Sequence, residues 1–517
     1  MPAPFGANRG TLPCRTVVWF LLGALVFLYL SLFILPTTPI YFAGDSSVYL
    51  LNAKRMLEGE SIYRDFFQFT LPGTEVFYLT LFKLVGPRIW IPNVTLIVLG
   101  LGLTALIAYV SRKVLAGWTA FLPALLFLTF VYWQWLDPSH HWFSTLMVMG
   151  ALAVVIERRT LPRLALAGAI CGLAAFFTQM KGVTGWLGLA MFLLWERRHT
   201  QEKYGSLLVK ELGLLTAFVV TLATASAYFI WNAGWERFLY CTLEFGIRYY
   251  PTNWSNNLSV YMTGLLPLGG HWYTMLRKLA AFLFLHSLFP LVFVLFFMRY
   301  RRRVSCQPSE PWDRLMLVSM VGLFLFIGVA RAPAWTRLDA VSPPALILAV
   351  WLMKSWGKLG RAALGCLGLF ALTLALVEPR SRQREACLYL PPPGPRACIR
   401  QGSYEEYRWV FDHTRPSEYF LEGHWPSFYF LLGLRNPASV PFLSNTNYTR
   451  PEQVRDVVDS LERHRVRFVL WTLVLELPDP RDAPGGDHLG PLRAYLRAHY
   501  HVAKTIAADE WIWERNP

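Results

Sequence analysis

The sequence predicts a polytopic α-helical membrane protein that carries a soluble α/β domain at its C-terminal end. Of its 517 residues, 54% are hydrophobic and only 16% are charged, which is too apolar for an ordinary soluble protein. Long apolar runs recur as far as residue 377, and Lys and Arg gather in short clusters between them. Beyond residue 377 the composition becomes mixed, as expected of a separate domain.

The membrane spans follow from the length that a helix needs. Roughly 20 apolar residues cross a hydrocarbon core of about 30 Å, and about eleven stretches approach this length. They are 17–36, 90–110, 115–135, 141–156, 162–179, 183–195, 209–231, 279–299, 314–330, 338–353 and 361–377. The fifth and sixth are short, and 76–86 could be an interfacial helix or part of a span. The first is too long for the apolar core of a signal peptide, so we expect a retained anchor.

Basic clusters set the orientation. The formal charge of +16 is spread over short clusters, without the continuous basic face or reading motif of a nucleic-acid-binding protein. Lys and Arg prefer cytoplasmic connections, so the N-terminus is predicted to be cytoplasmic. The clusters are 111–113, 157–163, 196–203, 299–303 and 354–361. A multi-pass protein of the cell or inner membrane follows, with the loops 37–89 and 232–278 and the C-terminal domain on the extracytoplasmic side.

The outer domain is predicted to begin at residue 378. Apolar spacing predicts helices at 452–464 and 491–500, a buried strand at 466–473 and a closing hairpin at 501–515. This alternation indicates a small α/β domain.

Two cysteines frame a short segment at the start of that domain. Cys387 and Cys398 enclose "PPPGP" in a loop predicted to lie outside, where an oxidising compartment would let them form a disulfide. The alternative is two unpaired small residues. CxxC, P-loop, GxSxG and HExxH motifs are absent from the sequence.

Asp45 opens an amphipathic stretch in the first outer loop. From Ser46 the sequence "SSVYLLNAKRMLEGE" places its apolar residues on one helical face, which predicts a helix lying on the membrane surface. A carboxylate at the start of such a helix accepts backbone N–H bonds, so Asp45 could be only a helix cap. A catalytic role is the other interpretation.

Further polar residues fall in the other outer connections. Asp137, His140 and His141 could bind a substrate or a divalent metal ion, the one cofactor that the sequence suggests, although interfacial hydrogen bonding is the commoner fate of such residues and adjacent helical side chains point apart. Lys181, between the two short spans, could hold a lipid-linked phosphate or snorkel to lipid headgroups. Three more outer side chains are candidates for binding substrate or phosphate: His271, Arg331 and Arg337.

Carboxylates and cations at one membrane face suit sugar transfer from a polyprenyl phosphate. The leaving phosphate needs cations, and the acceptor needs a carboxylate to take its proton. A transporter would instead place paired charges near the midplane of the bilayer.

The sequence resembles the GT-C superfamily of polyprenyl-phosphate-sugar-dependent glycosyltransferases, in the branch of protein O-mannosyltransferases and lipid A aminoarabinose transferase. The resemblance rests on "GDSSVYLLNAKRMLEGESIYRDFFQFTLPG", "AAFFTQMKGVTGW" and "HWPSFYFLLGLRNP". It implies that Asp45 is the general base with Asp65 as a second carboxylate, and that Lys181 lies near the donor phosphate. It also places Asp137 and His140 near donor or acceptor groups. Many members have an acidic pair in the first loop, whereas Ser46 follows Asp45 here, and this departure bears on metal dependence and activity.

The predicted function is therefore inverting transfer of a sugar from a polyprenyl-phosphate donor to a lipid, glycan or protein acceptor on the extracytoplasmic face. Membrane lipids are the other expected partners, and nucleic acid is not one. Two alternatives remain: a lipid-linked glycan transporter with the same topology, and a catalytically inactive GT-C-like binding protein.

Overall fold

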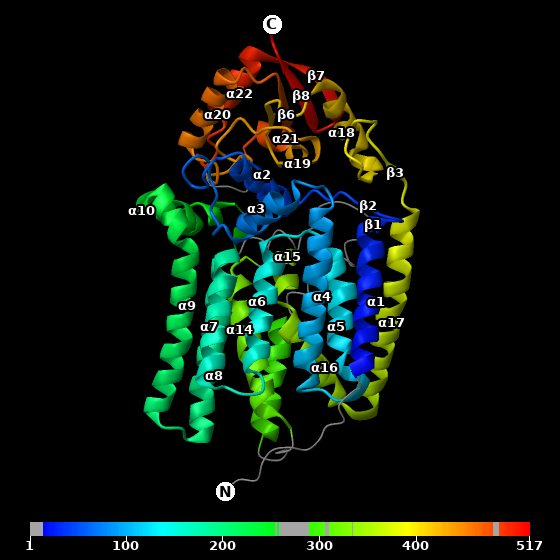
Figure 1. Ribbon diagram of the computed structural model, residues 1–517, viewed down its shortest axis with the longest axis vertical. Helices are drawn as coiled ribbons and strands as arrows, with labels where there is room; N and C mark the ends of the chain where they lie inside the picture. The colour runs from blue at the N-terminus through cyan, green and yellow to red at the C-terminus, as the bar shows by residue number, and fades with distance from the viewer. Residues whose placement is uncertain (1–13, 254–255, 258–288, 305–309, 333, 479–484) are drawn as a thin grey trace.

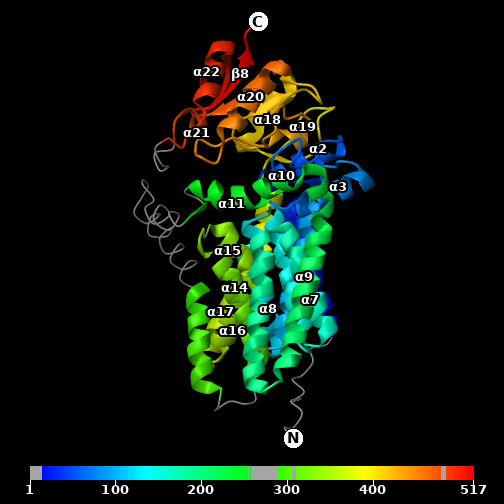
Figure 2. The same cartoon turned by 90° about the vertical axis from the view of Figure 1, so that its left-hand side faces the viewer.

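Long helices stand side by side beneath a mixed α/β domain (Figure 1). The structure is a computed structural model that describes residues 14–253, 256–257, 289–304, 310–332, 334–478 and 485–517. His271 lies outside the described residues. Two views at right angles show the same order: the helix bundle, a layer of short helices above it, and the C-terminal domain on top (Figure 2).

The bundle contains helices of several lengths. They are α1 (Cys14–Leu32), α4 (Ile91–Arg112), α5 (Leu122–Leu126) continued by η2 (Phe127–Val131) and η3 (Tyr132–Gln134), α6 (His140–Val155), α7 (Leu161–Phe177), α8 (Gln179–Thr200), α9 (Tyr204–Ala233), α14 (Trp312–Ala330), α16 (Pro343–Lys354) and α17 (Gly357–Arg384). Five helices in the described residues are long and apolar enough to cross a membrane: α1, α4, α9, α14 and α17. With the fold reported below, they make this an integral membrane protein.

Two sequence predictions differ from the helices observed. The sixth predicted span is not short, because α8 runs for 22 residues and has Lys181 in its first turn. Its charged last turn, "ERRHT", extends beyond the apolar stretch that marked the predicted end. At the other end of the bundle, α17 continues six residues past 378 to Arg384, so the predicted boundary of the C-terminal domain falls inside a helix.

Small residues let α7 and α9 pack closely. A Cβ atom on Gly168 would lie 2.1 Å from the carbonyl oxygen of Leu214, and one on Gly172 would lie 2.5 Å from that of Phe218. Only glycine permits such backbone approach, and the two glycines stand four residues apart on one face of α7. The α7–α9 contact therefore holds α9 against the bundle.

The basic connections gather at the end of the bundle opposite the C-terminal domain (Figure 1). Lys113 pairs with Glu157 there, and Arg159 pairs with Glu196 at 3.5 Å and with Asp313 at 2.9 Å. The first three basic clusters, which the sequence predicts on one side of the membrane, thus meet the start of α14 in a network of ion pairs.

The opposite end carries the short elements of the first and later outer loops. They are β1 (Phe33–Ile34), β2 (Thr38–Pro39), α2 (Asp45–Leu57), α3 (Gly73–Val85), α10 (Trp235–Leu239), η4 (Tyr240–Glu244), α11 (Phe245–Arg248), η5 (Tyr250–Thr252) and α15 (Trp335–Val341); the remaining short helix, η1 (Gly117–Ala120), precedes α5. Nine of the 13 residues of α2 are buried. The prediction of a helix lying on a membrane surface is therefore wrong for α2, because its apolar residues Tyr49, Leu50 and Ala53 pack inside the protein, in one cluster with Tyr78 and Phe82 of α3 and Phe430 of the C-terminal domain.

A four-stranded sheet forms the centre of the C-terminal domain, in the order β5 (Phe420–Glu422), β6 (Phe468–Thr472), β8 (Glu510–Arg515) and β7 (Tyr500–Ala507). β5 pairs parallel with β6, and the other two pairs are antiparallel, β7 and β8 forming the closing hairpin. The other elements are β3 (Cys387–Leu388), β4 (Ile399–Arg400), α18 (Gln401–His413), α19 (Phe428–Leu432), α20 (Pro451–Arg463), α21 (Leu473–Glu476) and α22 (Gly490–His499).

Hydrophobic cores join the C-terminal domain to the first outer loop. Leu51 of α2 packs in one cluster with Phe428 and Leu434, and Phe67 packs in another with Leu421 and other residues of the domain. Shared cores of this kind oppose independent movement of the two parts. The layer that carries Asp45 is thus fixed from above by the C-terminal domain.

A disulfide joins Cys387 and Cys398, whose Cα atoms lie 5.0 Å apart. The residues beside these cysteines pair as β3 and β4, and the Cys398 amide donates a hydrogen bond of 2.9 Å to the Pro39 carbonyl. The disulfide loop therefore also contacts the first outer loop.

Candidate functional site

The site begins where α2 starts. Asp45 is the first residue of α2, and Gly44 occupies the cap position, where its N–H donates to Ser47 Oγ at 3.4 Å. The interpretation of Asp45 as only the cap of a helix starting at Ser46 is therefore wrong. Because Gly44 has an extended backbone and Asp45 already has helical geometry, the carboxylate of Asp45 is not used as a cap.

Asp137 lies directly against this turn. Its Oδ1 accepts a hydrogen bond of 3.0 Å from the Ser46 amide, and a Cβ atom on Gly44 would come within 2.9 Å of the Asp137 carboxylate. Gly44 is thus required for the approach of the two segments. Two carboxylates, one from each outer loop, meet at the start of α2.

The Asp45–Asp137 pair is electrostatically strained. Burial, followed by the negative charge of Asp45, raises the pKa of Asp137 to about 7. Burial also raises the pKa of Asp45, although the positive charge of Arg337 opposes this rise. Asp137 Oδ2 is buried and has no hydrogen-bond partner within the described part of the chain. An unused carboxylate oxygen next to a second carboxylate is typical of a proton-accepting or ligand-binding site.

Two histidines stand beside the carboxylates. The Tyr49 hydroxyl and His140 Nδ1 form a hydrogen bond, and His141 is buried with no partner for its Nδ1 among the residues described. The rings of His140 and His141 lie 4.0 Å apart, so the expectation that they point apart is wrong. His140 is the first residue of α6, where no preceding turn restricts its side-chain rotamer.

Lys181 lies below the histidines. It is only 3% exposed, and its Nζ donates to the carbonyl of His141 at 3.0 Å and to Thr145 Oγ1 at 3.4 Å. A lysine so enclosed does not reach lipid headgroups, which contradicts the snorkelling interpretation for this conformation. The structure instead directs a buried amino group toward the start of α6.

The two arginines predicted at this face differ in environment. Arg337 donates to the Tyr250 hydroxyl at 2.6 Å and to Asn256 Oδ1 at 2.5 Å, and its charge acts on Asp45. Arg331 follows α14 and is exposed. The structure thus brings Arg337 into the site, but it does not enclose Arg331 there.

Asp65 lies apart from the carboxylate pair. Its Oδ2 lies 2.9 Å from Arg64 Nη2 and accepts a hydrogen bond of 2.7 Å from the Ser61 amide. The hydrogen bond from Arg64 is the main reason why the pKa of Asp65 is lowered. Arg64 also binds Asn232 at the end of α9. Asp65 is thus a partly exposed residue whose contacts stabilise its own loop. The resemblance had implied a different role for Asp65, as a second carboxylate that assists Asp45.

Glu75, which the sequence analysis missed, is a third buried carboxyl group near Asp45. Its Oε1 accepts hydrogen bonds from Gln68 Nε2 at 2.7 Å and Asn52 Nδ2 at 3.3 Å, whereas Oε2 has no partner among the described residues. Burial raises the pKa of Glu75 to about 7, and its charge acts on Tyr49. In the sequence, Glu75 looks like an ordinary acidic residue in the first turn of a helix. The only sign that it is buried is the apolar character of its neighbours in "LPGTEVFYL".

The predicted metal site has no matching cluster of ligands among the described residues. Among them, no group of three or more His, Cys, Asp or Glu side chains gathers closely enough to hold a metal ion. Asp45 and Asp137 could supply two oxygen ligands. Because His140 Nδ1 is engaged by Tyr49, that atom would have to give up its hydrogen bond to become a ligand.

A solved structure shares this architecture. No protein-family model and no curated protein matches the sequence. ArnT from Cupriavidus metallidurans, in its apo state, aligns over 96% of this chain and 97% of its own, with 14% sequence identity and a TM-score of 0.57. The oligosaccharyltransferase of Archaeoglobus fulgidus, in complex with Zn and sulfate, covers 89% of this chain and 68% of its own, with 13% identity and a TM-score of 0.48. The likeness to ArnT shows that this chain has the GT-C fold.

Proposed function

We propose that this protein, with its GT-C fold, is a membrane glycosyltransferase that moves a sugar from a polyprenyl-phosphate donor to a lipid, glycan or protein acceptor. The observation that carries the proposal is the Asp45–Asp137 pair, of which Asp137 is buried and has an unused carboxylate oxygen, with the basic side chains of Lys181 and Arg337 at the same end of the bundle. A base and phosphate-binding cations are the two groups that this transfer needs.

The reaction is a single inverting displacement. Asp45 accepts the proton of the acceptor hydroxyl or amine while the acceptor atom bonds to the anomeric carbon. The bond between that carbon and the phosphate oxygen breaks, and the polyprenyl phosphate leaves as an anion. Lys181, together with Arg337, stabilises the charge of the leaving phosphate. Asp137 places the start of α2 through its hydrogen bond from the Ser46 amide.

Two observations favour an enzyme over the alternatives. Ionisable side chains of the described bundle helices lie toward the helix ends, as Lys181 and Arg112 do, whereas a transporter would pair charges along a path at the midplane. An inactive binding protein would have no need to maintain two neighbouring carboxylates, one of them buried. Asp137 therefore supplies, from the second outer loop, the acidic partner that Ser46 does not provide in the first.

The proposed orientation places the site outside the cytoplasm. The basic connections joined through Arg159 would lie in the cytoplasm, and the C-terminal domain would lie outside. Reporter fusions at Arg303 and Pro517 should therefore report opposite sides of the membrane. Reporters on the same side would contradict the orientation.

The catalytic role of Asp45 is tested by Asp45→Asn. Asparagine keeps the size of the side chain but cannot accept the acceptor's proton. We expect a folded protein that still binds the donor and whose transfer rate at saturating donor falls by about 10²–10⁴-fold. The rate should be measured beside a melting curve on the same preparation. Normal transfer by a well-folded Asp45→Asn protein would contradict the mechanism.

A further inference from the structure

The C-terminal domain touches the backbone next to the proposed base. Trp425 Nε1–H donates a hydrogen bond of 3.0 Å to the carbonyl oxygen of Gly44, the residue that precedes Asp45. A Cβ atom on Gly44 would lie 2.9 Å from the Asp137 carboxylate, so the backbone approaches Asp137 closely there. A side chain 381 residues away in sequence therefore holds the peptide on which the spacing of the two carboxylates depends.

Trp425 is itself held on a fixed loop between β5 and α19. Glu422 is 1% exposed and accepts hydrogen bonds from the Ser427 amide at 2.8 Å, the Ser427 hydroxyl at 2.7 Å and the Phe428 amide at 2.9 Å. The Trp425 ring packs on Phe442 with centroids 4.9 Å apart. These contacts close the loop at both ends and orient the indole, so its N–H is a positioned donor.

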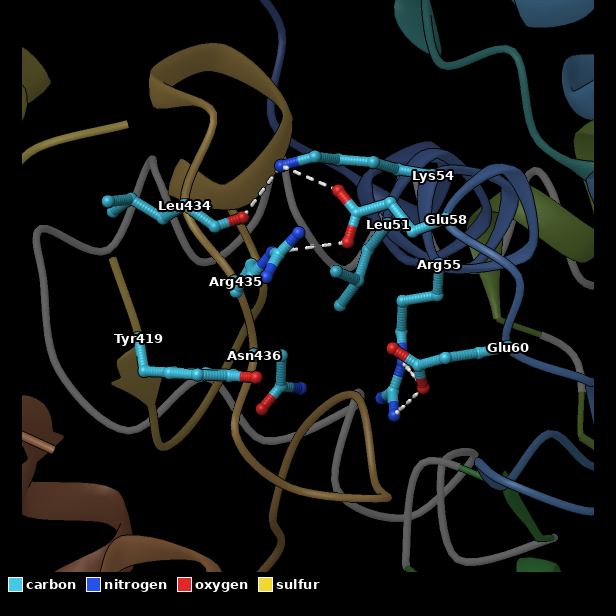
Figure 3. A pocket seen from close by; sticks show the side chains of 9 residues that line it. All are labelled: Leu51, Lys54, Arg55, Glu58, Glu60, Tyr419, Leu434, Arg435 and Asn436. Carbon is cyan, nitrogen blue, oxygen red and sulfur yellow. Dashed lines mark hydrogen bonds and ion pairs between the residues drawn. The ribbon is translucent and has the colours of Figure 1, made fainter. Parts of the chain in front are cut away.

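The other end of α2 is held by the same domain. Lys54 Nζ donates to the Leu434 carbonyl at 2.8 Å, and Arg435 pairs with Glu58 at 3.3 Å. Arg55 Nη1 donates to the Ala438 carbonyl at 2.8 Å. Figure 3 shows Lys54, Arg55, Glu58 and Arg435 around a polar cavity of about 160 Å³ between α2 and the domain. Ion pairs satisfy the charges that line it, so this cavity is a junction between two parts of the chain.

We propose that the C-terminal domain positions the catalytic carboxylate, and that Trp425 is the positioning residue at the reactive end of α2. The inference rests on the proposed function of Asp45. Contacts of Lys54 and Arg55 fix the far end of the helix, and the Trp425 hydrogen bond fixes where it begins. Loss of that bond lets the start of α2 shift relative to Asp137, which lowers the rate of proton transfer without removing the base. Misplacement of about 1 Å at a reacting group is enough for a large loss of rate.

The test compares Trp425→Phe with Trp513→Phe in the full-length protein in lipid nanodiscs. Both changes replace an indole of the C-terminal domain with a phenyl ring, but Trp513 Nε1 has no partner in the described part of the chain, so only Trp425→Phe removes a hydrogen bond. The first readout is hydrogen exchange of the amides at 45–50. The second is transfer, measured as separate kcat and donor KM values with a polyprenyl-phosphate sugar.

Trp425→Phe should speed exchange at 45–50 and lower kcat roughly tenfold while donor KM stays unchanged. Trp513→Phe should leave all three quantities unchanged. Equal exchange in the two variants would overturn the inference whatever the activity. Faster exchange with an unaltered kcat would also overturn it, since the held position would then not matter for transfer. A wild-type protein without transfer activity would contradict the proposed function, and the exchange comparison would still decide whether Trp425 holds α2.

Discussion

Ion pairs at one end of the helix bundle contrast with a pair of carboxylates at the other end. At the end with the basic connections, cations meet carboxylates: Lys113 pairs with Glu157, and Arg159 pairs with Glu196 and Asp313. At the other end, Asp137 faces a second carboxylate, and one of its oxygens has no partner in the described chain. Charges that satisfy one another stabilise structure, whereas buried charges left unsatisfied indicate a site that a ligand completes.

The largest expected effect concerns the carboxylate pair. We predict that Asp45→Asn and the double variant Asp45→Asn/Asp137→Asn lose transfer by the same factor, about 10²–10⁴-fold, because Asp137 acts through Asp45. Asparagine at 137 can still accept the Ser46 N–H, so the turn should stay folded. Single-turnover rates measure the effect. A double variant much slower than Asp45→Asn would show that Asp137 has an independent catalytic role.

Lys181 should show the next largest effect. Lys181→Met keeps the length of the buried side chain but removes the charge, so donor use should fall by some tenfold to a hundredfold while acceptor KM changes little. Arg331→Ala is the matched control at an exposed cation and should have a smaller effect, as should Arg337→Ala. Steady-state kinetics with varied donor separate the three. Unchanged donor kinetics in Lys181→Met would remove Lys181 from the phosphate site.

The disulfide should affect stability rather than chemistry. Replacing both Cys387 and Cys398 with Ser removes the constraint that the bond places on the unfolded C-terminal domain, at a cost of about 2–3 kcal/mol in its free energy of unfolding. Thermal or denaturant unfolding in the native membrane lipid measures this cost. Equal stability of the Ser variant and the wild type would contradict the prediction, as would two free thiols in non-reducing peptide maps.

The smallest expected effect on transfer lies at the basic end. Arg159→Ala leaves Glu196 and Asp313 without their partner and should lower thermal stability, yet transfer by the folded protein should equal that of the wild type. Arg158→Ala, at the exposed neighbouring position, is the control and should change neither quantity. A loss of transfer in Arg159→Ala without a matching loss of stability would contradict the assignment of a structural role to the basic end and a catalytic role to the opposite end.

Individual residues of the site could be predicted from the sequence, but their assembly could not. The apolar runs and basic clusters indicate which connections face the same side, and this placed Asp45, Asp137 and Lys181 together as candidates. The distance between Asp45 and Asp137 depends on Gly44, whose role appears only when a Cβ atom is placed there. Asp65 shares a loop with Asp45, but its local partners Arg64 and Ser61 decide its position.

The packing of α2 against the C-terminal domain could not be predicted from the sequence either. Its amphipathic spacing indicates a helix with one apolar and one charged face, and a membrane surface is the simplest partner for such a helix. The actual partner of Lys54 and Arg55 is a domain some 380 residues further along the chain. Local periodicity contains no information about such a contact. Glu75 was missed for a related reason, because its burial arises from packing between loops.

The pH dependence of transfer tests the coupled pair most directly. The charge of Asp45 helps to raise the pKa of Asp137 to about 7, so Asp45 loses its proton before Asp137 does. Asp137→Asn keeps position 137 uncharged at every pH. The measurement is kcat at saturating donor and acceptor between pH 4 and pH 9, for the wild type and for Asp137→Asn. We predict that the acid limb, which reports Asp45, stays in place in the variant, whereas the change in kcat that ionisation of Asp137 causes near pH 7 in the wild type disappears. A profile that still changes near pH 7 in Asp137→Asn, or that does not change there in the wild type, would contradict a catalytic Asp45 coupled to Asp137.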